Sequence, residues 1–509
     1  MPSATAGIQP ALEQFLQSSR QPAILEPGSD PILLGADNFQ ISVHGEVVTL
    51  EAWDETHNLV RRVRRILEER RGRVEIEVER FGGRPGRLTL VDLAHPSNRD
   101  ATRKGSRLKF RERFRRSLLR QFADWKLVAL TTEPDLHHSL SPAYPRAFLR
   151  KGTAGLAVIG AAEDSLDPDG ALTFGLIWLD YLRRREQRVS LQGLAIFVPA
   201  GRERTTCHRV RALDPAAASF LVFIHFPDGS EEAVNPGDYT NFETRIEMCR
   251  QPLAASGTEL AGWIDRLAAM EGVERRDHPD GSVSLGVHGL EFARASGGKL
   301  LFGLEQKQMA TRTRLEEIEA LAESLRRMRH SSAADPENSV YARHPEAWLE
   351  SQVRANLEKI EPRLFARPVY GQVPQFAGGE RGILDLLAAD RDGRLAVIEI
   401  KASQDVHLPL QALDYWIRVK WHLERGEFSG RGYFPGLELR RDPPALLLVA
   451  PALDFHPSNE IVLRFFSPEV PAERIGVGIQ WRQELRAMFR SSAGSWWPSN
   501  AKLSRPSQV

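Results

Sequence analysis

Two short apolar runs in the C-terminal half of the chain are separated by a polar turn. The runs span residues 382–389 and 395–400, and the turn between them is Asp390-Arg391-Asp392-Gly393. Runs of this length around a turn rich in Asp and Gly predict a β-hairpin. A pattern of helical period follows around Gln411, so the predicted order is strand, strand, helix.

Three charged residues interrupt these apolar runs. Asp385 lies in the first run, and Glu399 and Lys401 lie at the end of the second. Because side chains alternate across a strand, Glu399 and Lys401 share one face, and Ile398 and Ile400 point the other way. The hairpin can bring Asp385 against them. Buried charges are costly unless they are paired or bind a metal, so the pattern predicts a polar site here.

A helix is predicted upstream of the hairpin, with Pro345 in its first turn. Its apolar residues recur at helical spacing: Leu349, Val353, Leu357 and Ile360. Glu350 points into this stripe, and Glu346 is close behind it on the same face. Either acid can join the polar site. The alternative for both is a solvated acid that favours the helix dipole.

The same order of elements is predicted a second time in the N-terminal half. It comprises a helix at 111–122, strands at 126–131, 146–150 and 156–159, a helix at 172–185 and a strand at 194–199. The run Leu156-Ala157-Val158-Ile159 matches Leu395-Ala396-Val397-Ile398, and Pro-Ala ends the last strand of each half. We expect an internal duplication. The alternative is chance, because these are common residues and helix–strand orders recur.

A gapless alignment from this shared run shows what the N-terminal copy has lost. Asp385 falls on Arg146, Glu399 on Gly160, and Lys401 on Ala162. The copy therefore lacks every charged residue of the polar site.

Composition sets the frame for these elements. The 509 residues are 42% hydrophobic and 27% charged, which is typical of a globular protein of three or four domains. No run approaches the roughly 18 apolar residues of a membrane span, and the first 30 residues do not resemble a secretory signal. Cys207 and Cys249 are not in metal-binding spacing, so we expect a cytoplasmic protein.

Positive charge is concentrated in two stretches despite a net charge of +1. Residues 58–73 read as an arginine-rich helix, and residues 103–120 form a second one in which Glu112 is the one acid. Arg111, Arg115 and Arg116 of the second stretch are candidates for phosphate contacts. The alternative is a solvated helix face that answers acids elsewhere, such as Glu75, Glu77 and Glu79.

The C-terminal pattern resembles the PD-(D/E)xK nuclease superfamily. The matching parts are the acid Asp385, the Glu399-Ile400-Lys401 motif 14 positions later, and Gln411 and Tyr415, which match the QxxxY motif of RecB-like members. The family usually has Pro before the first acid, and this chain has Leu384 there. The resemblance implies an α/β, restriction-endonuclease-like C-terminal domain. It also implies that the N-terminal copy is a degenerate nuclease-like domain.

The resemblance implies a Mg²⁺-dependent DNA nuclease in which Mn²⁺ can replace Mg²⁺. Its metal ligands would be Asp385, Glu399, the carbonyl of Ile400 and Glu350. Lys401 would orient water, with Gln411 and Tyr415 supporting the site, and Arg418 on the same helix could touch a phosphate. The alternatives are a catalytically silent DNA-binding or scaffold protein, or a subunit that is inert until assembled. No P-loop is present, so a helicase-coupled role would need an ATP-driven partner.

The expected domain order completes the prediction. It is a disordered N-terminus at 1–30, a small α+β domain at 31–100, the degenerate copy at 103–228, a small α+β connecting domain at 229–330, a linker at 331–340, the nuclease-like domain at 341–490 and a polar tail at 491–509.

Overall fold

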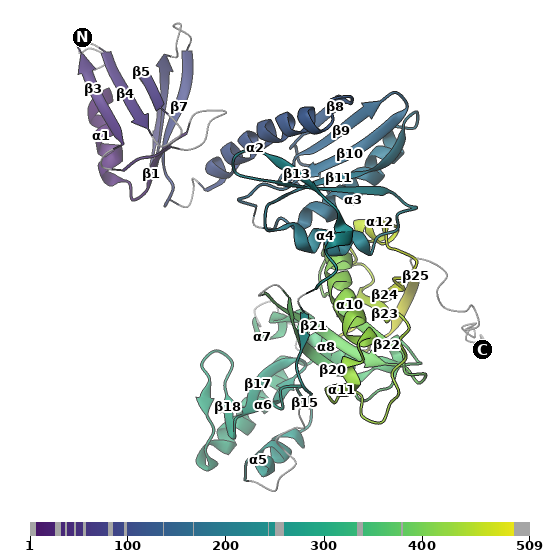
Figure 1. The fold of residues 1–509 in the computed structure, drawn as a ribbon. Coiled ribbons are helices and arrows are strands. Elements are labelled where there is room, and N and C mark those ends of the chain that lie inside the picture. The colour runs from purple at the N-terminus through teal and green to yellow at the C-terminus, as the bar shows by residue number, and fades with distance from the viewer. Residues whose placement is uncertain are drawn as a thin grey trace, which may run out of the picture. The chain divides into compact units, whose positions relative to one another are not determined.

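The protein is described as a computed structural model, shown in Figure 1. It covers residues 7–25, 32–35, 38–44, 47–53, 58–79, 85–95, 99–135, 137–165, 167–242, 244–249, 259–332, 339–377 and 380–492. The chain divides into two compact units. The first comprises Met1–Pro168, Phe197–Pro199 and His225–Glu232, and the second comprises Asp169–Ile196, Ala200–Ile224 and Ala233–Val509. The predicted mixed α/β class is confirmed.

A seven-stranded sheet with the order β2-β1-β7-β6-β5-β4-β3 opens the first unit. Its strands are β1 Pro22–Leu25, β2 Ile32–Leu33, β3 Phe39–His44, β4 Val47–Trp53, β5 Asn58–Arg70, β6 Arg73–Glu79 and β7 Pro85–Asp92. Helix α1 (Ile8–Ser18) buries Ile8, Leu12 and Phe15 in the same core as these strands. The prediction that residues 1–30 are disordered is therefore wrong for 8–25, because an amphipathic helix and a strand complete this sheet domain; residues 1–6 and 26–30 lie outside the described part.

The stretch 58–73 is a strand, β5, and the prediction of a helix there is wrong. Leu59, Val63 and Ile66 face the core at spacings of four and three residues, which imitates a helix. The four-residue step is ordinary strand alternation, whereas the three-residue step arises because β5 shifts register against β6 between Val63 and Arg65. Such β-bulges place an extra residue in one strand and break the two-residue period.

Two arginines of β5 form ion pairs with acids of the neighbouring strand β6, as the alternative to phosphate contacts predicted. Arg64 lies 2.6 Å from Glu79, and Arg65 lies 2.8 Å from Glu77. These exposed cross-strand pairs make β5 a poor candidate for phosphate contacts.

A six-stranded sheet follows, with the order β13-β12-β11-β10-β9-β8. Its elements are α2 Arg99–Gln121, β8 Lys126–Thr131, β9 Arg146–Lys151, β10 Ala154–Gly160, α3 Gly170–Arg185, β11 Ser190–Pro199, α4 Glu203–Arg211, β12 Ser219–His225 and β13 Glu231–Val234. All elements predicted for this region are confirmed. The predicted boundary at residue 229 is wrong, because β13 belongs to this sheet.

The C-terminal sheet has seven strands in the order β14-β20-β21-β22-β23-β24-β25. Its elements are η2 Pro236–Asp238, β14 Thr244–Ile246, α7 Ser339–Ala342, α8 Pro345–Ala355, α9 Leu357–Ile360, β20 Tyr370–Ala377, β21 Glu380–Ala389, β22 Leu395–Ile400, α10 Leu408–Glu424, α11 Glu427–Gly430, β23 Ala445–Pro451, α12 Ser458–Leu463, β24 Ala472–Val477 and β25 Ala487–Ser492. β21 and β22 are antiparallel, whereas β22, β23 and β24 are parallel. The predicted tail at 491–509 begins inside β25, and residues 493–509 lie outside the described part.

Both sheets follow the chain in the same sequence. β8 to β13 are adjacent in chain order, and so are β20 to β25, with β14 added at the edge. In each sheet a helix precedes the first strand and a long helix connects the third and fourth. The repeated architecture predicted from the sequence is therefore present in the structure.

A small α+β domain with its own core lies between these sheets in the chain. It has a five-stranded sheet with the order β15-β16-β17-β18-β19. Its elements are α5 Glu259–Ala268, β15 Val273–Asp277, β16 Val283–Val287, β17 Leu290–Ser296, β18 Lys299–Phe302, β19 Gln308–Met309, η4 Arg312–Arg314 and α6 Leu315–Met328. The sequence predicted a small α+β connecting domain at 229–330, and these elements span residues 259–328. Of the predicted linker 331–340, residues 333–338 lie outside the described part.

Candidate active site

The hairpin of β21 and β22 forms because one face of each strand is fully apolar. Leu386 and Ala388 of β21, with Ile398 and Ile400 of β22, are buried in one core that also contains the apolar stripe of α8 and α9. Glu399 therefore lies on the opposite face of β22, as the alternation predicted. α10 packs against β22 and β23.

Asp385 and Glu399 meet at the end of this hairpin. One carboxylate oxygen of Asp385 accepts a hydrogen bond of 2.8 Å from the backbone N–H of Ile400. Burial, together with the charges of the nearby acids Glu350 and Glu346, raises the pKa of the Asp385 carboxyl to about 7. The Ile400 hydrogen bond and Lys401 oppose it without cancelling it. The site thus holds more negative charge than its cation neutralises.

Glu399 is the most deeply buried acid of the site, with 4% of its surface exposed. Its Oε2 atom is buried and has no hydrogen-bond partner among the described residues. Burial, followed by the charge of Asp385, raises the pKa of the Glu399 carboxyl well above its usual value. Asp405 contributes to the same rise. Sequence reasoning missed Asp405, although it stands four residues after Lys401 in the loop that leads to α10.

The two candidate acids of α8 have different partners. Glu346 is half exposed, and its carboxylate lies 3.8 Å from the ammonium of Lys401. Glu350 is buried and pairs with Arg276 of β15 at 3.2 Å and with Arg354 at 3.1 Å. Because two guanidiniums already hold Glu350, Glu346 is the better placed of the two to complete the site.

The residues of α10 form the wall beside β22. Gln411 is half-buried, and its side chain makes no hydrogen bond with any residue the structure describes. The guanidinium of Arg418 lies 5.9 Å from the ring centre of Tyr415. Asp414 fixes this helix through two hydrogen bonds from Arg209 of α4, at 2.9 and 2.8 Å. That anchor lies 205 residues away in the chain, and no sequence motif marks it.

The donor set of the site fits a hard divalent cation. Asp385, Glu399 and the carbonyl of Ile400 supply oxygen atoms, which Mg²⁺ and Mn²⁺ prefer. The unpartnered oxygen of Glu399 and the raised pKa of both acids show that the carboxylates lack a compensating charge. Within the described ranges, no group of three or more His, Cys, Asp or Glu side chains is arranged to hold a metal. A third protein carboxylate would have to come from Glu346 by rotation of its side chain.

The equivalent site in the six-stranded sheet is offset by one residue from the gapless alignment. The backbone N–H of Ala161 bonds to the carbonyl of Phe197, as the N–H of Lys401 bonds to that of Val449. β9 pairs Arg146 with Ile159. Ile159 therefore corresponds to Glu399 and Ala161 to Lys401, and the predicted matches Gly160 and Ala162 are wrong. The β9–β10 hairpin is one residue shorter than its counterpart, which a gapless alignment cannot show.

Arg146 does occupy the position of Asp385, as predicted. It is 2% exposed, and its guanidinium donates to the carbonyls of Ser141 at 2.7 Å and Glu133 at 2.6 Å. These bonds hold the loop between β8 and β9. With Ile159 and Ala161 beside it, this copy has no carboxylate at the positions that correspond to the acids of the hairpin.

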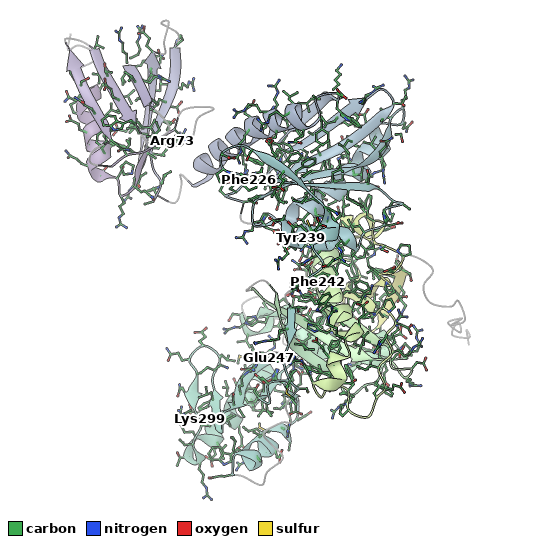
Figure 2. All side chains as sticks on the ribbon, viewed as in Figure 1. Arg73, Phe226, Tyr239, Phe242, Glu247 and Lys299 are labelled. Atoms are coloured by element: carbon green, nitrogen blue, oxygen red, sulfur yellow. The ribbon has the colours of Figure 1, made fainter. Side chains whose placement is uncertain are left out.

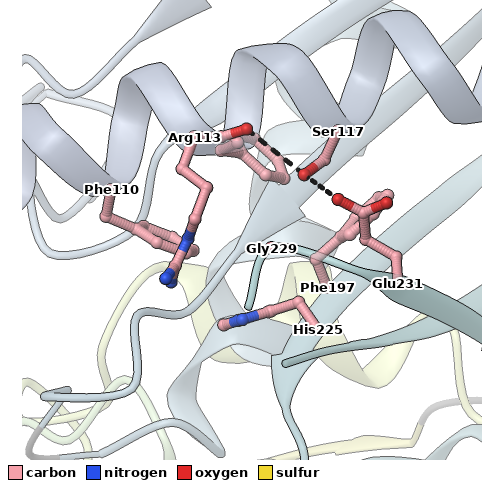
Figure 3. Close-up of a pocket in the computed structure, with 8 residues that line it drawn as sticks. Phe110, Arg113, Ser117, Phe197, His225, Gly229 and Glu231 are labelled. Atoms are coloured by element: carbon pink, nitrogen blue, oxygen red, sulfur yellow. Dashed lines mark hydrogen bonds between the residues drawn. The ribbon is translucent and has the colours of Figure 1, made fainter. Parts of the chain in front are cut away.

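Two arginines of the second basic stretch are structural. Arg113 pairs with Glu163, and Arg120 pairs with Glu231. Figure 3 shows the cavity beneath α2, where the Ser117 hydroxyl lies between the Arg113 carbonyl and the Glu231 carboxylate. For these two side chains the alternative holds, because acids elsewhere in the chain neutralise their charge.

The three predicted phosphate-contacting arginines differ in exposure. Arg115 and Arg116 are exposed and form no ion pair with the residues that the structure describes. Arg111 is half-buried, and its Nε atom is buried without a hydrogen-bond partner among those residues. Arg115 and Arg116 thus provide the accessible positive charge of this helix.

No protein-family model matches the chain, and no curated protein matches it. The two thiols, Cys207 and Cys249, are free. Among the described residues, no helix has the length and apolar character needed to cross a membrane.

Proposed function

We propose that the protein is a metal-dependent DNA nuclease of the PD-(D/E)xK type that hydrolyses phosphodiester bonds. The observation that carries this proposal is the pairing of two carboxylates, the half-buried Asp385 and the buried Glu399, beside the ammonium of Lys401. Such a pair has no stabilising role of its own in an apolar hairpin. It becomes favourable when a divalent cation supplies the missing charge.

Asp385, Glu399 and the carbonyl of Ile400 would hold the cation, with Glu346 as the fourth donor. When bound, Mg²⁺ supplies a Lewis acid that polarises a phosphate oxygen and lowers the pKa of a water. The hydrogen bond from Ile400 fixes one oxygen of Asp385, which leaves its other oxygen for the cation. The raised pKa of both carboxyls makes their ionisation, and hence cation binding, dependent on pH.

Lys401 would act on the reacting phosphate itself. Its ammonium shares the face of Glu399 and lies at the end of the strand, with 19% of its side chain exposed. A cation in this position orients the attacking water and offsets the negative charge that develops on the phosphate oxygens. Gln411 would hold that water, since its amide is not engaged by any described residue.

The alternative is a catalytically silent nuclease-like protein that binds DNA or serves as a scaffold. The copy that carries Arg146, Ile159 and Ala161 shows how such a domain loses its acids, and the C-terminal domain keeps them. The proposal includes a candidate partner, an ATP-driven helicase. It also includes a cytoplasmic location.

Incubation of end-labelled single- and double-stranded DNA with Mg²⁺ or Mn²⁺ tests the proposal. We expect cleavage by the wild type, none in EDTA and none by Glu399→Ala. Glu438→Ala, which removes an exposed acid outside the site, is the matched control and should cleave normally. Cleavage that persists in EDTA, or in the purified Glu399→Ala variant, would overturn the assignment.

A further inference from the structure

Besides the cavity beneath α2, the protein has a hollow in the second unit. It lies between α4, α10 and the segment that follows η2. It encloses about 210 Å³ and is open to solvent on one side. Its wall includes the aromatic and basic side chains of His208, Arg211, Phe242, Trp416, Lys420 and Trp421. Figure 2 labels Tyr239 and Phe242 on the segment that forms one side.

Phe242 is the centre of an open aromatic cluster. Its ring centre lies 4.4 Å from that of His208 and 5.0 Å from that of Trp421, which stands nearly perpendicular to it at 78°. The guanidinium of Arg211 lies 5.7 Å from the same ring. Phe242 is half-buried, so part of the ring remains available to a planar ligand. Aromatic rings of this kind are stacking platforms for nucleobases.

His208 supplies a polar group at the base of the hollow. Its Nε2 atom is buried and has no hydrogen-bond partner among the described residues. Burial, followed by the charges of Arg204 and Arg211, lowers the pKa of His208 to about 4. The ring is therefore neutral at pH 7. A buried polar atom without a partner is costly, and the polar edge of a base would satisfy it.

The charges around the hollow favour an anion at its rim. Arg204, Arg211 and Arg418 all lie close enough to His208 to act on it electrostatically. Lys420 is answered by the exposed acids Glu424 at 3.7 Å and Glu469 at 3.4 Å, which are weak surface pairs. Glu424 and Glu469 also line the hollow, and Asp414 acts on His208 with the opposite sign to the arginines. Arg211 is the arginine that lines the hollow, and its guanidinium suits a phosphate.

The hollow also shares a helix with the candidate active site. Gln411 and Trp421 are ten residues apart on α10, which is about 15 Å along a helix. That distance equals the rise of four to five nucleotides in one strand of a duplex. The α10 residues that line the hollow lie on the side of the helix away from Gln411, so a strand has to pass around the helix to reach both places.

We propose that this hollow binds one unpaired nucleotide of a nucleic-acid strand, with its base stacked on Phe242 and hydrogen-bonded to His208 and its phosphate beside Arg211. This inference deepens the proposed function and rests on it, because the strand is the one whose phosphodiester reaches Asp385 and Glu399. A paired base cannot enter the hollow, so the site gives the protein a preference for single strands.

Fluorescence anisotropy with a labelled oligothymidylate and a labelled blunt duplex tests the inference. The measurements use Glu399→Ala protein in EDTA, so that binding is read without cleavage. Phe242→Ala should weaken binding of the single strand about tenfold, equivalent to one stacked base, and leave duplex binding unchanged. Phe242→Tyr should bind like the parent, and so should Trp53→Ala, which removes an exposed aromatic from the N-terminal sheet.

Arg211→Ser gives an independent readout. It should flatten the salt dependence of single-strand binding by about 0.7 in log–log slope, as the loss of one phosphate contact requires. An unchanged slope, together with single-strand binding by Phe242→Ala equal to that of the parent, would overturn the inference. Equal loss of single-strand and duplex binding in Phe242→Ala would also overturn it, because it would indicate a structural role.

Competition identifies the class of ligand. Deoxyadenosine monophosphate should displace the labelled strand, and N-acetyltryptophanamide should not. The reverse result would assign the hollow to an aromatic side chain of a protein partner and overturn the nucleotide. If the wild type cleaves DNA but Phe242→Ala binds normally, this inference alone fails; if binding depends on Phe242 but no cleavage occurs with metal, the proposed nuclease activity alone fails.

Discussion

Leu213 and Phe466 form an antiparallel bridge in which both residues hold the same place in their own copy of the repeated fold. Each lies six residues before a strand, β12 for Leu213 and β24 for Phe466. The flanking hydrogen bonds are reciprocal: Asp214 donates to the carbonyl of Phe465 at 2.8 Å, and Ser467 donates to that of Ala212 at 2.9 Å. This is the pattern that a two-fold axis imposes on an interface.

The helices on either side of the bridge obey the same symmetry. α3 packs against α12, and α4 packs against α10. In the repeated fold α3 corresponds to α10 and α4 to α12, so the two contacts are related by exchange of the copies. These elements of the second unit thus meet as the subunits of a two-fold dimer do, although they belong to one chain.

The acids Glu346 and Glu350 should respond differently to removal. Glu350→Ala leaves Arg276 and Arg354 buried without their shared partner, and we expect it to destabilise the protein by about 3–5 kcal/mol. Glu346→Ala removes a half-exposed acid and should leave stability nearly unchanged while it weakens metal-dependent cleavage. Urea unfolding and cleavage assays of both variants check this. Equal effects of the two changes on both readouts would contradict the distinction.

The stability of the metal-free protein should fall as pH rises from about 4 to about 7. Burial raises the pKa of Asp385 from 3.8 to about 7, and the pKa of Glu399 also rises, so the folded state keeps protons that the unfolded state releases in this window. Their ionisation therefore opposes folding, and for Asp385 alone the cost is on the order of 4 kcal/mol at pH 8.

Urea unfolding of the wild type and of Glu399→Gln in EDTA, at pH 5 and pH 8, measures this effect. The variant should be more stable than the wild type at pH 8 and should differ less from it at pH 5. Addition of Mg²⁺ should stabilise the wild type more than the variant. Identical pH dependence of the two proteins would show that Glu399 is not held at a raised pKa.

The one-residue offset predicts that the side chain at position 160 faces α2, and a substitution that disturbs packing there tests it. A Cβ atom at Gly160 would lie 2.9 Å from the ring of Phe114, because this position faces α2 as Ile400 faces α8. Gly160→Val should therefore destabilise the protein by about 1–3 kcal/mol. In a Phe114→Ala background the same change should cost clearly less. Additive effects in this double-mutant cycle would mean that Gly160 does not face α2.

Arg115 and Arg116 should contribute to nucleic-acid affinity through α2. Changing Arg111, Arg115 and Arg116 to Ser should weaken binding to all sequences alike and flatten the salt dependence by up to ~3 in log–log slope. The matched control changes Arg62, Arg64 and Arg65 of β5, two of which pair with Glu79 and Glu77. If the salt slope changes in the β5 control and not in the α2 variant, the binding surface lies on β5 and the prediction for α2 is wrong.

Local patterns predicted the hairpin, the order of elements and the position of the acids, because alternation and turn residues determine them within a few residues. Three errors share a physical cause. The bulges of β5 imitated a helical period, the shorter β9–β10 hairpin shifted the alignment by one residue, and α1 is ordered by a core that it shares with strands as far along the chain as β7. Each depends on pairing with residues elsewhere in the chain.

The supporting contacts of the site were also invisible in the sequence. Arg276 reaches Glu350 across 74 residues, and Arg209 reaches Asp414 across 205. Neither arginine stands in a motif. The chemistry could be predicted from Asp385, Glu399 and Lys401, whereas the residues that hold these elements in place required the structure.

The most direct test of the account is a time course of supercoiled plasmid with purified protein and Mg²⁺. Because Arg146 occupies the place of Asp385 in the six-stranded sheet, the two repeated architectures hold, among the described residues, one set of candidate acids at Asp385 and Glu399. We predict that nicked circles accumulate before any linear product, that EDTA stops the reaction, and that Asp385→Asn abolishes it. Nicking at an undiminished rate by Asp385→Asn, or in EDTA, would contradict the central claim.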